Sequence, residues 1–395
     1  MQSFSELGVS ARIVRALAER DIHIPFPIQA HVLADALAGR DILAKAPTGS
    51  GKTIAFAIPL VERIDVGDRR PAAVVLVPTR ELASQVAGEL KAVAPSGLEV
   101  ATVYGGVPLH AQSKRARNAH IVVATPGRLN DLLERKAISL ESVKILVLDE
   151  ADRMLDMGFK PQVDRIVRRM PRERQTMFFS ATLDATVGEL ARAYTSNPVR
   201  SDAAPLVTET SSEVEHRFVS VKADDKVETL AELLRGDRGL ALVFVRTRRG
   251  ADRLVKKLKF HQVDAVALHG DMSQGQRERS LRRFETGHAT TLVATDVAAR
   301  GLDLVDITHV INFDPPAEHS GYLHRVGRTG RAGRSGVGVT FVLPEQQEDV
   351  SRVARLAGHT EQFASGGMKV APPRRVYSSR RGRSKWGSVA PRRKI

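Results

Sequence analysis

The chain has 395 residues, 42% of them hydrophobic, which is enough for two packed domains and a short appendage. A net charge of +15 with only 5% aromatic residues favours a polyanionic partner that is held mainly through its phosphates. Cysteine is absent, which excludes disulfides, thiolate metal sites and thiol nucleophiles. Residues 1–14 lack the apolar core of a signal peptide, and no apolar run approaches the roughly 20 residues that span a bilayer. We therefore expect a cytoplasmic protein with no membrane partner.

Short β-branched runs alternate with helical patterns in the first half of the chain. Fully apolar strands that alternate with helices predict a parallel sheet covered on both faces. One such helix is expected over residues 54–64. The predicted strands cover residues 41–45, 72–77, 100–104, 121–124, 144–148 and 176–179.

A polar stretch over residues 196–212 has no periodicity and is the best candidate for a linker. The second half then repeats the α/β pattern, with helices expected over residues 226–234 and 248–258. Its predicted strands cover residues 214–221, 240–245, 264–268, 290–294, 308–311 and 338–343. The sequence therefore predicts two similar α/β domains.

The apolar periodicity fades after residue 357. Residues 371–395 carry nine cations and no acid, so they contribute nine of the fifteen net positive charges. A segment of this composition cannot bury enough apolar surface to fold alone, and we expect residues 358–395 to form a disordered, polyanion-binding tail.

A phosphate-binding loop is predicted between the first strand and the first long helix. In such a loop, small residues let successive backbone N–H groups surround the phosphates of a nucleotide. The side chain of Lys52 would reach the β- and γ-phosphates, and the hydroxyl of Thr53 would ligate Mg²⁺. A glycine-rich turn with an exposed lysine is the alternative interpretation. The loop reads Ala46-Pro47-Thr48-Gly49-Ser50-Gly51-Lys52-Thr53.

An acidic quartet, Asp149-Glu150-Ala151-Asp152, follows the apolar strand at 144–148. Ligands of open α/β sheets collect at the carboxyl ends of strands, where carboxylates can hold Mg²⁺ and orient an attacking water. Beside the phosphate loop, Asp149 is the candidate Mg²⁺ ligand, partly through water, and Glu150 the candidate base. These acids could instead simply cap the next helix.

A basic run near the end of the second domain, His324-Arg325-Val326-Gly327-Arg328-Thr329-Gly330-Arg331, has three arginines in eight residues. Guanidinium groups bind phosphate oxygens and can neutralise charge that develops in phosphoryl transfer. A solvated basic loop is the alternative.

From residue 4 to about 345 the chain resembles the DEAD-box family of ATP-dependent RNA helicases. Besides the three motifs above, the resemblance depends on an isolated Phe4, Pro25-Phe26-Pro27-Ile28-Gln29, Pro78-Thr79-Arg80-Glu81-Leu82, Gly105-Gly106, Thr125-Pro126-Gly127-Arg128, Ser180-Ala181-Thr182, Val243-Phe244-Val245, Gln274 with Arg277, and Thr295-Asp296-Val297-Ala298-Ala299-Arg300-Gly301-Leu302-Asp303.

This resemblance implies two RecA-like doubly wound parallel-sheet domains with ATP in the cleft between them and RNA across the opposite side. The expected segments are an adenine-reading region at 1–30, an ATP-binding domain at 31–205, a flexible linker at 206–213, a second domain at 214–357 and a basic RNA-binding tail at 358–395. The side chains of Arg328 and Arg331, in the basic run, would contact the γ-phosphate of ATP only when the two domains close.

The resemblance also implies roles for further residues. For the nucleotide they are Phe4, Gln29, which would read the adenine edge, and Asp303, which would touch the ribose. For the RNA backbone they are Pro78, Thr79, Arg80, Gly105, Gly106, Thr125, Arg128, Gln274, Arg277 and Thr295. For coupling between the domains they are Asp152, Ser180, Thr182, Asp296, Arg300 and His324.

Departures from the family pattern occur around the adenine site. Asp21 and Ile22 replace a usual glycine and aromatic residue, and Phe26 replaces a common threonine. We therefore expect a weakened or differently packed base pocket, in which Gln29 keeps the preference for ATP.

The expected function is RNA-stimulated ATP hydrolysis, with Mg²⁺, that locally unwinds short RNA duplexes or remodels ribonucleoproteins. An RNA chaperone that anneals RNA with little turnover and a DNA-directed motor of the same superfamily are the alternatives, because phosphate contacts do not distinguish RNA from DNA. Ribosomal particles and RNA-decay proteins are expected partners, and the absence of coiled-coil heptads favours a monomer.

Overall fold

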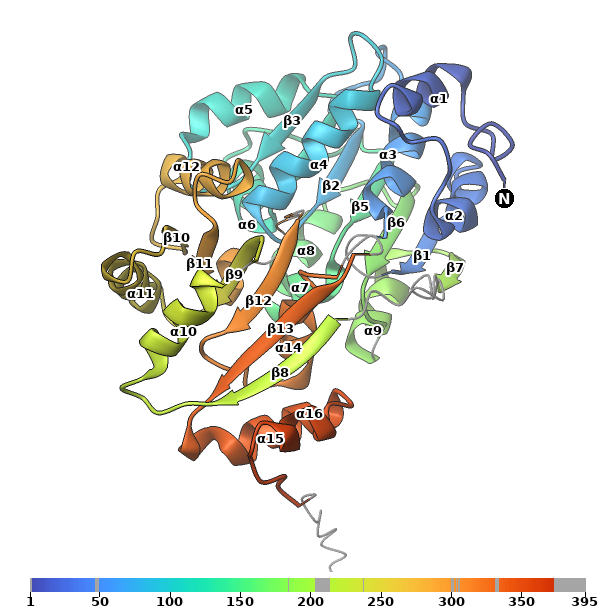
Figure 1. Ribbon diagram of the computed structural model, residues 1–395. Helices are drawn as coiled ribbons and strands as arrows, with labels where there is room; N and C mark the ends of the chain where they lie inside the picture. Colours follow the sequence, from blue (N-terminus) through green and yellow to red (C-terminus); the bar gives the residue numbers. More distant parts are fainter. Residues whose placement is uncertain are drawn as a thin grey trace, which may run out of the picture.

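Two parallel β-sheets, one from each half of the chain, form the framework of the protein (Figure 1). The computed structural model describes residues 2–46, 50–183, 185–202, 214–236, 238–299, 302, 304, 306–330 and 334–372. Both sheets are flanked by helices, which confirms the expected pair of α/β domains. No helix among the described residues is long and apolar enough to cross a membrane.

The first sheet has seven parallel strands in the order β3-β4-β2-β5-β6-β1-β7. Most of its central strands are buried along their whole length, as continuous apolar runs in a two-sided sheet require. The strands are β1 (Ile42–Lys45), β2 (Ala73–Leu76), β3 (Val100–Val103), β4 (Ile121–Ala124), β5 (Ile145–Leu148), β6 (Gln175–Ser180) and β7 (Val199–Asp202).

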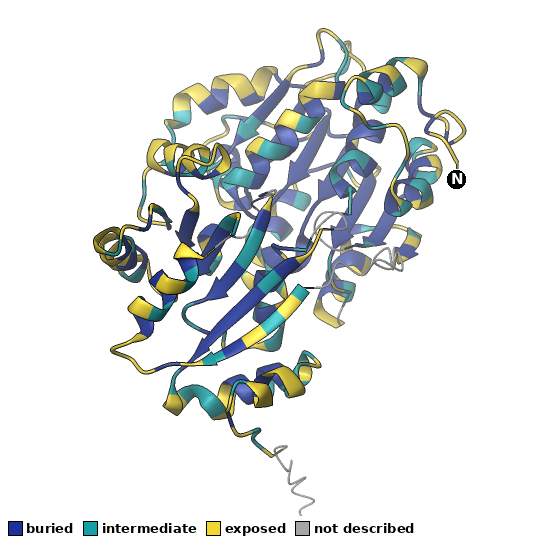
Figure 2. Cartoon of the chain, viewed as in Figure 1, coloured by how far each residue is buried: buried dark blue, intermediate teal, exposed yellow. Residues whose placement is uncertain are grey.

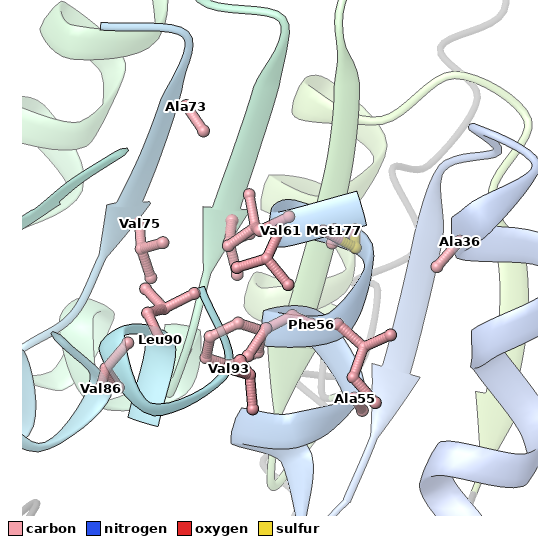
Figure 3. Packing of buried hydrophobic residues seen from close by; sticks show 14 of the residues in the cluster. Ala36, Ala55, Phe56, Val61, Ala73, Val75, Val86, Leu90, Val93 and Met177 are labelled. Atoms are coloured by element: carbon pink, nitrogen blue, oxygen red, sulfur yellow. The ribbon is translucent and has the colours of Figure 1, made fainter. Parts of the chain in front are cut away.

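Helices cover both faces of the first sheet. Figure 3 shows the packing on one face, where Phe56 and Val61 of α3 and Leu90 of α4 lie against strand residues such as Val75 and Met177. The helices are α1 (Ala11–Ala18), α2 (Pro27–Leu37), α3 (Lys52–Arg63), α4 (Arg80–Val93), α5 (Leu109–Asn118), α6 (Pro126–Glu134), α7 (Ala151–Asp156), α8 (Lys160–Val167) and α9 (Ala185–Tyr194). The first four contribute to one apolar cluster and the last five to the other.

The second sheet has six parallel strands in the order β10-β11-β9-β12-β13-β8. They are β8 (Val214–Ser220), β9 (Leu240–Phe244), β10 (Ala265–Leu268), β11 (Thr291–Ala294), β12 (Ile307–Asn312) and β13 (Gly336–Val342). All twelve strands predicted from the sequence are present, with ends that differ by two residues at most.

The helices of the second domain bury their apolar sides against this sheet, and their outer faces stay exposed (Figure 2). They are α10 (Lys226–Arg235), α11 (Arg248–Phe260), α12 (Gln274–Glu285), α13 (Asp296–Ala299), α14 (His319–Val326), a 3₁₀ turn (Pro344–Gln346), α15 (Gln347–Leu356) and α16 (Thr360–Ser365).

Two expectations about the ends of the domains were wrong. The polar stretch at 196–212 contains β7, an edge strand that pairs with β1; its alternating sequence is too polar to read as a buried strand. The expected disordered tail begins too early at residue 358, because α16 packs there through Phe363, which is 0% exposed. The expected linker at 206–213 and residues 373–395 lie outside the described residues.

The carboxyl ends of β1, β5 and β6 lie at one edge of the first sheet, since the strands are parallel and β6 separates β1 from β5. The phosphate loop leaves β1, the acidic quartet leaves β5, and Ser180 ends β6. Parallel topology therefore brings together three motifs that are far apart in sequence.

A histidine pair joins α16 to the edge strand β8 and should make the second domain sensitive to acid. His216 stacks on His359 with ring centroids 3.6 Å apart, and its Nδ1 lies 2.6 Å from the Tyr322 hydroxyl. Burial, aided by His359, lowers the pKa of His216 to about 4. Between about pH 6.5 and 4 His216 is protonated in the unfolded chain but stays neutral in the folded domain. Protons therefore stabilise the unfolded state, and the free energy of unfolding decreases as the pH falls through that window.

Urea unfolding followed from pH 7 to pH 4 checks this expectation. His216→Asn should flatten the pH dependence of the free energy of unfolding, whereas His288→Asn, on the exposed surface, should not. Equal pH dependence in the wild type and His216→Asn would contradict it.

Candidate functional site

The phosphate loop lies between β1 and the first turn of α3. Gly51 has φ +84°, a left-handed conformation that favours glycine, and a Cβ there would lie 2.5 Å from Gln29 Nε2. The Lys52 side chain is buried, and its Nζ donates to Ala46 O at 2.9 Å. The Lys52 side chain therefore turns back toward Ala46, the residue at which its loop begins. Ser50 and Thr53 flank this turn, and Pro47, Thr48 and Gly49 lie outside the described residues.

Gln29 is attached to the phosphate loop. Its Nε2 donates to Gly51 O at 3.0 Å, and its Oε1 accepts from the Phe26 backbone N–H at 2.9 Å. The Phe26 ring is 46% exposed, whereas Ile22 packs against the apolar core. Phe4, expected to bind nucleotide, is instead 2% exposed within that core, so it can support the region but not contact a ligand.

The acidic pair is buried at the carboxyl end of β5, with Asp149 2% and Glu150 4% exposed. Burial raises the pKa of Asp149 to about 6, although Lys52 opposes the rise. Burial also acts to raise the pKa of Glu150, but Arg153, Lys52 and Arg328 outweigh it and lower that pKa. Glu150 is therefore held as a carboxylate by cations from both domains.

Arg153 is a partner of Glu150 that the sequence interpretation missed. Its Nη1 donates to Glu150 Oε2 at 2.6 Å, and both side chains are almost fully buried. The spacing of three residues on α7 was the available signal. Glu150 itself has φ +53°, an unfavourable conformation for a residue with a side chain, at the start of that helix.

Asp152 ties the acidic loop to the end of β6. Its Oδ2 accepts from the backbone N–H groups of Ala181 and Thr182, each at 3.2 Å, and its own N–H donates to Ser180 Oγ at 3.3 Å. These bonds lie within the first domain. A link from Ser180 and Thr182 to the second domain stays a prediction.

In the second domain, Arg325 braces the basic run. It forms a two-pronged ion pair with Asp296, at 2.6 and 2.7 Å, and donates to Asn312 Oδ1 at 3.0 Å. Phe244 lies beneath its guanidinium, 5.0 Å away. Asp296, expected to couple the domains, is thus the anchor of Arg325, a structural role that the sequence interpretation did not assign. His324 lies beside this pair around a narrow pocket.

Among the described residues of the second domain, Arg328 acts on Glu150 of the acidic pair. It is 3% exposed, its Nη1 donates to Leu302 O at 2.6 Å, and its charge helps to lower the pKa of Glu150. The structure therefore brings residues 150 and 328 into one electrostatic site. Arg300, Asp303 and Arg331 lie outside the described residues, so their predicted roles stay predictions.

A groove of about 310 Å³ is lined by residues of both domains. It brings together seven of the ten residues predicted to contact RNA. These are Pro78, Thr79, Arg80, Gly105, Thr125 and Arg128 from the first domain and Arg277 from the second. Met157, Phe159, Gly270 and Val297 also line it and were not predicted.

Two groove arginines also donate to acceptors of the protein, and their predicted contacts with phosphates stay predictions. Arg128 Nη1 donates to Val107 O and to Gln112 Oε1, each at 3.0 Å. Arg277 donates through Nε to Glu81 Oε1 at 2.7 Å across the domain boundary, and both side chains are at most 10% exposed. Glu81 is therefore an interdomain residue that local sequence did not reveal.

The remaining predicted RNA residues do not line the groove. Gly106 has φ +85°, and a Cβ there would lie 2.1 Å from Arg80 Nη1, so this glycine makes room for a groove arginine. Gln274 is half-buried at the start of α12, and its Nε2 donates to Glu278 Oε1 at 3.1 Å. Thr295 is buried before α13, where its carbonyl accepts from the N–H groups of Ala298 and Ala299.

The donor set fits Mg²⁺ that is shared with a phosphate ligand. One buried carboxylate, Asp149, follows β5, and one hydroxyl, Thr53, follows β1 at the same edge of the sheet; both are hard oxygen donors. Among the described residues there is no group of three or more His, Asp or Glu side chains that could hold a metal alone. Mg²⁺ usually keeps waters and substrate phosphates among its ligands, so it does not require a cluster of protein carboxylates.

Two family models match the chain: the DEAD/DEAH box helicase model over residues 26–190 and the helicase conserved C-terminal domain model over residues 225–333. The DEAD-box ATP-dependent RNA helicase CshA of Streptococcus pneumoniae is 42% identical over 348 residues, which are 87% of this chain and 66% of that protein. CshA of Geobacillus kaustophilus is 40% identical over 360 residues, 90% of this chain and 76% of that protein. The chain thus spans about two thirds to three quarters of the length of these relatives.

Solved structures show the same architecture. S. cerevisiae Dbp5 bound to RNA and ADP BeF3 is 30% identical, with a TM-score of 0.79 over 92% of this chain and 94% of that chain. Mss116p bound to ssRNA and AMP-PNP is 27% identical, with a TM-score of 0.78 over 90% of this chain and 77% of that chain.

Proposed function

We propose that this chain, which belongs to the family of DEAD-box ATP-dependent RNA helicases, hydrolyses ATP when RNA closes its two domains and thereby separates short RNA duplexes. The observation that carries this proposal is the division of the site. Lys52, Asp149 and Glu150 come from the first domain and Arg328 from the second, and the charges of Lys52 and Arg328 both lower the pKa of Glu150.

Each residue of the site has a role that follows from its position. Amides at the start of α3 and Lys52 would hold the phosphates of ATP, and Gln29 would position the adenine edge beside Gly51. Asp149 and Thr53 would hold Mg²⁺, which when bound neutralises phosphate charge. Glu150, kept ionised by Arg153 and Arg328, would accept a proton from the attacking water, while Arg328 faces the phosphate that leaves.

Domain closure would couple this chemistry to RNA. The groove is lined from both domains, so a strand bound along Pro78, Arg80 and Thr125 also meets Val297 and Ala298 of the second domain. Closure would then bend the strand and disfavour pairing with its complement, and reopening would release it. Ribosomal particles and RNA-decay assemblies in the cytoplasm would be suitable substrates for a monomer acting in this way.

The experiment that tests the function compares ATPase stimulation by RNA and by DNA of matched sequence. We expect RNA to stimulate turnover strongly and DNA weakly, and ATP to be preferred over GTP because of Gln29. Equal stimulation by DNA would favour a DNA-directed motor. Strand annealing without any RNA-stimulated turnover would favour the chaperone alternative.

The ion pair between Glu81 and Arg277 should favour the closed state. When one partner of a buried, hydrogen-bonded charge pair is truncated, the other charge is left unpaired, at a cost of about 2–5 kcal/mol. Opening the domains would hydrate that charge, so Glu81→Gln should raise the RNA concentration needed for half-maximal ATPase by about tenfold or more, with less effect on ATP binding to the open protein.

Fluorescence energy transfer between dyes on the two domains measures this closure directly. The exchanged pair, Glu81→Arg with Arg277→Glu, should restore part of what either single charge reversal loses. If Glu81→Gln leaves both closure and the RNA requirement at wild-type values, the pair is not a closure contact.

A further inference from the structure

A basic hollow lies at the edge of the first sheet opposite the phosphate loop. Its volume is about 800 Å³, and it is formed by segments that precede β2, β4, β5 and β6, four adjacent strands of the sheet. Leu133, Ile138, Leu140 and Met170 give it an apolar lining, and each of them is at least 93% buried. None of the catalytic or RNA-groove residues described above contributes to it.

The charged lining of the basic hollow consists of five cations, Arg70, Arg117, Lys136, Arg168 and Arg169, and one acid, Glu141. Within the described chain, no carboxylate lies within 4.0 Å of a charged nitrogen of these five cations, although twenty such ion pairs occur elsewhere. The lining of the basic hollow therefore has a formal net charge of +4 (five cations and one acid).

Two of the five cations are already oriented. Arg70 Nη1 donates to Asn118 O at 2.9 Å, and Arg117 donates through Nε and Nη2 to Ala137 O at 3.3 and 3.2 Å. Because a guanidinium has five N–H donors, each keeps donors for a further acceptor. Oriented forks of this kind suit phosphate oxygens, and Arg is weakly hydrated, so it gives up water to a phosphate readily.

We infer that the basic hollow is a second RNA site, which binds backbone phosphates of an RNA whose single-stranded part occupies the groove. This inference rests on the proposed function. The strands β2, β4 and β5 have four residues each, about 13 Å, so a structured RNA can extend from the groove around one end of the domain to the hollow. An RNA held there keeps its single-stranded part near the groove and raises its local concentration.

Neutralising three of the cations tests the site without touching the oriented pair. The variant is Lys136→Gln/Arg168→Gln/Arg169→Gln, whose three side chains are exposed. The matched control, Lys256→Gln/Lys257→Gln/Lys259→Gln, removes the same charge from exposed positions of α11 in the second domain. Binding is measured with a hairpin RNA that carries a single-stranded tail, and with a single-stranded oligonucleotide just long enough to saturate the ATPase.

For the hairpin RNA, loss of three phosphate contacts should flatten the slope of log affinity against log salt by about 2 and weaken affinity about tenfold or more at moderate salt. The control should change both quantities much less. Turnover stimulated by the short oligonucleotide should equal the wild-type value in both variants.

Equal effects of the two triple variants on the hairpin would overturn the second site, because only overall charge would then matter. An unchanged hairpin affinity of the hollow variant would also overturn it. The same holds if the three substitutions weaken binding of polyglutamate but not binding of hairpin RNA. Failure of the short oligonucleotide to stimulate ATP hydrolysis by the wild type would count against the proposed function. That result is independent of the hairpin affinities, so the two failures can be distinguished.

Discussion

Glu150→Gln is expected to bind ATP and RNA, close its domains and lose turnover. The substitution keeps the shape of the side chain but removes the carboxylate that would take a proton from water, and a positioned base contributes about 10²- to 10⁴-fold. Arg153 would keep a hydrogen-bond acceptor in the glutamine amide oxygen, so the buried loop should stay folded. RNA-stimulated phosphate release measures the loss, and binding of a fluorescent ATP analogue measures what is retained.

Asp164→Asn on the neighbouring helix α8 is a suitable control for this variant. Asp164 pairs with Lys160 and Tyr194 away from the acidic loop, so its loss should change stability rather than turnover. Turnover of Glu150→Gln within a few-fold of the wild type would remove Glu150 from the chemistry. A variant that fails to bind ATP would assign it a structural role.

The parts of this site that could be predicted from sequence are those set by local spacing. A phosphate loop needs its glycine, lysine and threonine within a few residues, between a strand and a helix, and Gly51 with Lys52 at the start of α3 satisfies this. The acidic pair likewise follows from a strand end. Parallel topology then places these segments at one edge of the sheet without further information from side chains.

The parts that could not be predicted depend on which charges meet after folding. Arg277 and Glu81 are 196 residues apart, and nothing near either one identifies the other. Arg128 suits a phosphate in sequence terms, and only the folded structure shows that it also donates to the carbonyl of Val107 and the side-chain amide of Gln112. Sequence gives the charge of an arginine, whereas its partner is a property of the fold.

Edges and ends of the domains were difficult for a different reason. An edge strand such as β7 is hydrogen-bonded on one side and partly wet, so its burial pattern is weak and its sequence resembles a loop. A short terminal helix such as α16 depends on a single large anchor, Phe363, against the sheet. Neither leaves the continuous apolar run by which the central strands were identified.

Arg328→Ala is expected to cause a larger loss of RNA-stimulated turnover than Glu150→Gln. An arginine that stabilises the charge of phosphoryl transfer contributes about 10³- to 10⁵-fold in rate where it has been measured. Because Arg328 comes from the second domain and Lys52 and Gln29 from the first, ATP affinity of the open protein should change little. The expected signature is therefore a fall in kcat with a nearly constant Kd for ATP, measured by stopped-flow phosphate release and by equilibrium titration.

Arg328 also donates to Leu302 O, so loss of the side chain could disturb the second domain itself. Arg328→Lys separates the two effects: it keeps the positive charge and one donor but loses the planar fork, and should recover stability more than turnover. Arg253→Ala, on the exposed face of α11, controls for loss of an arginine. If Arg328→Ala keeps RNA-stimulated turnover with an intact thermal transition, the catalytic site is complete within the first domain, and closure would act on RNA alone.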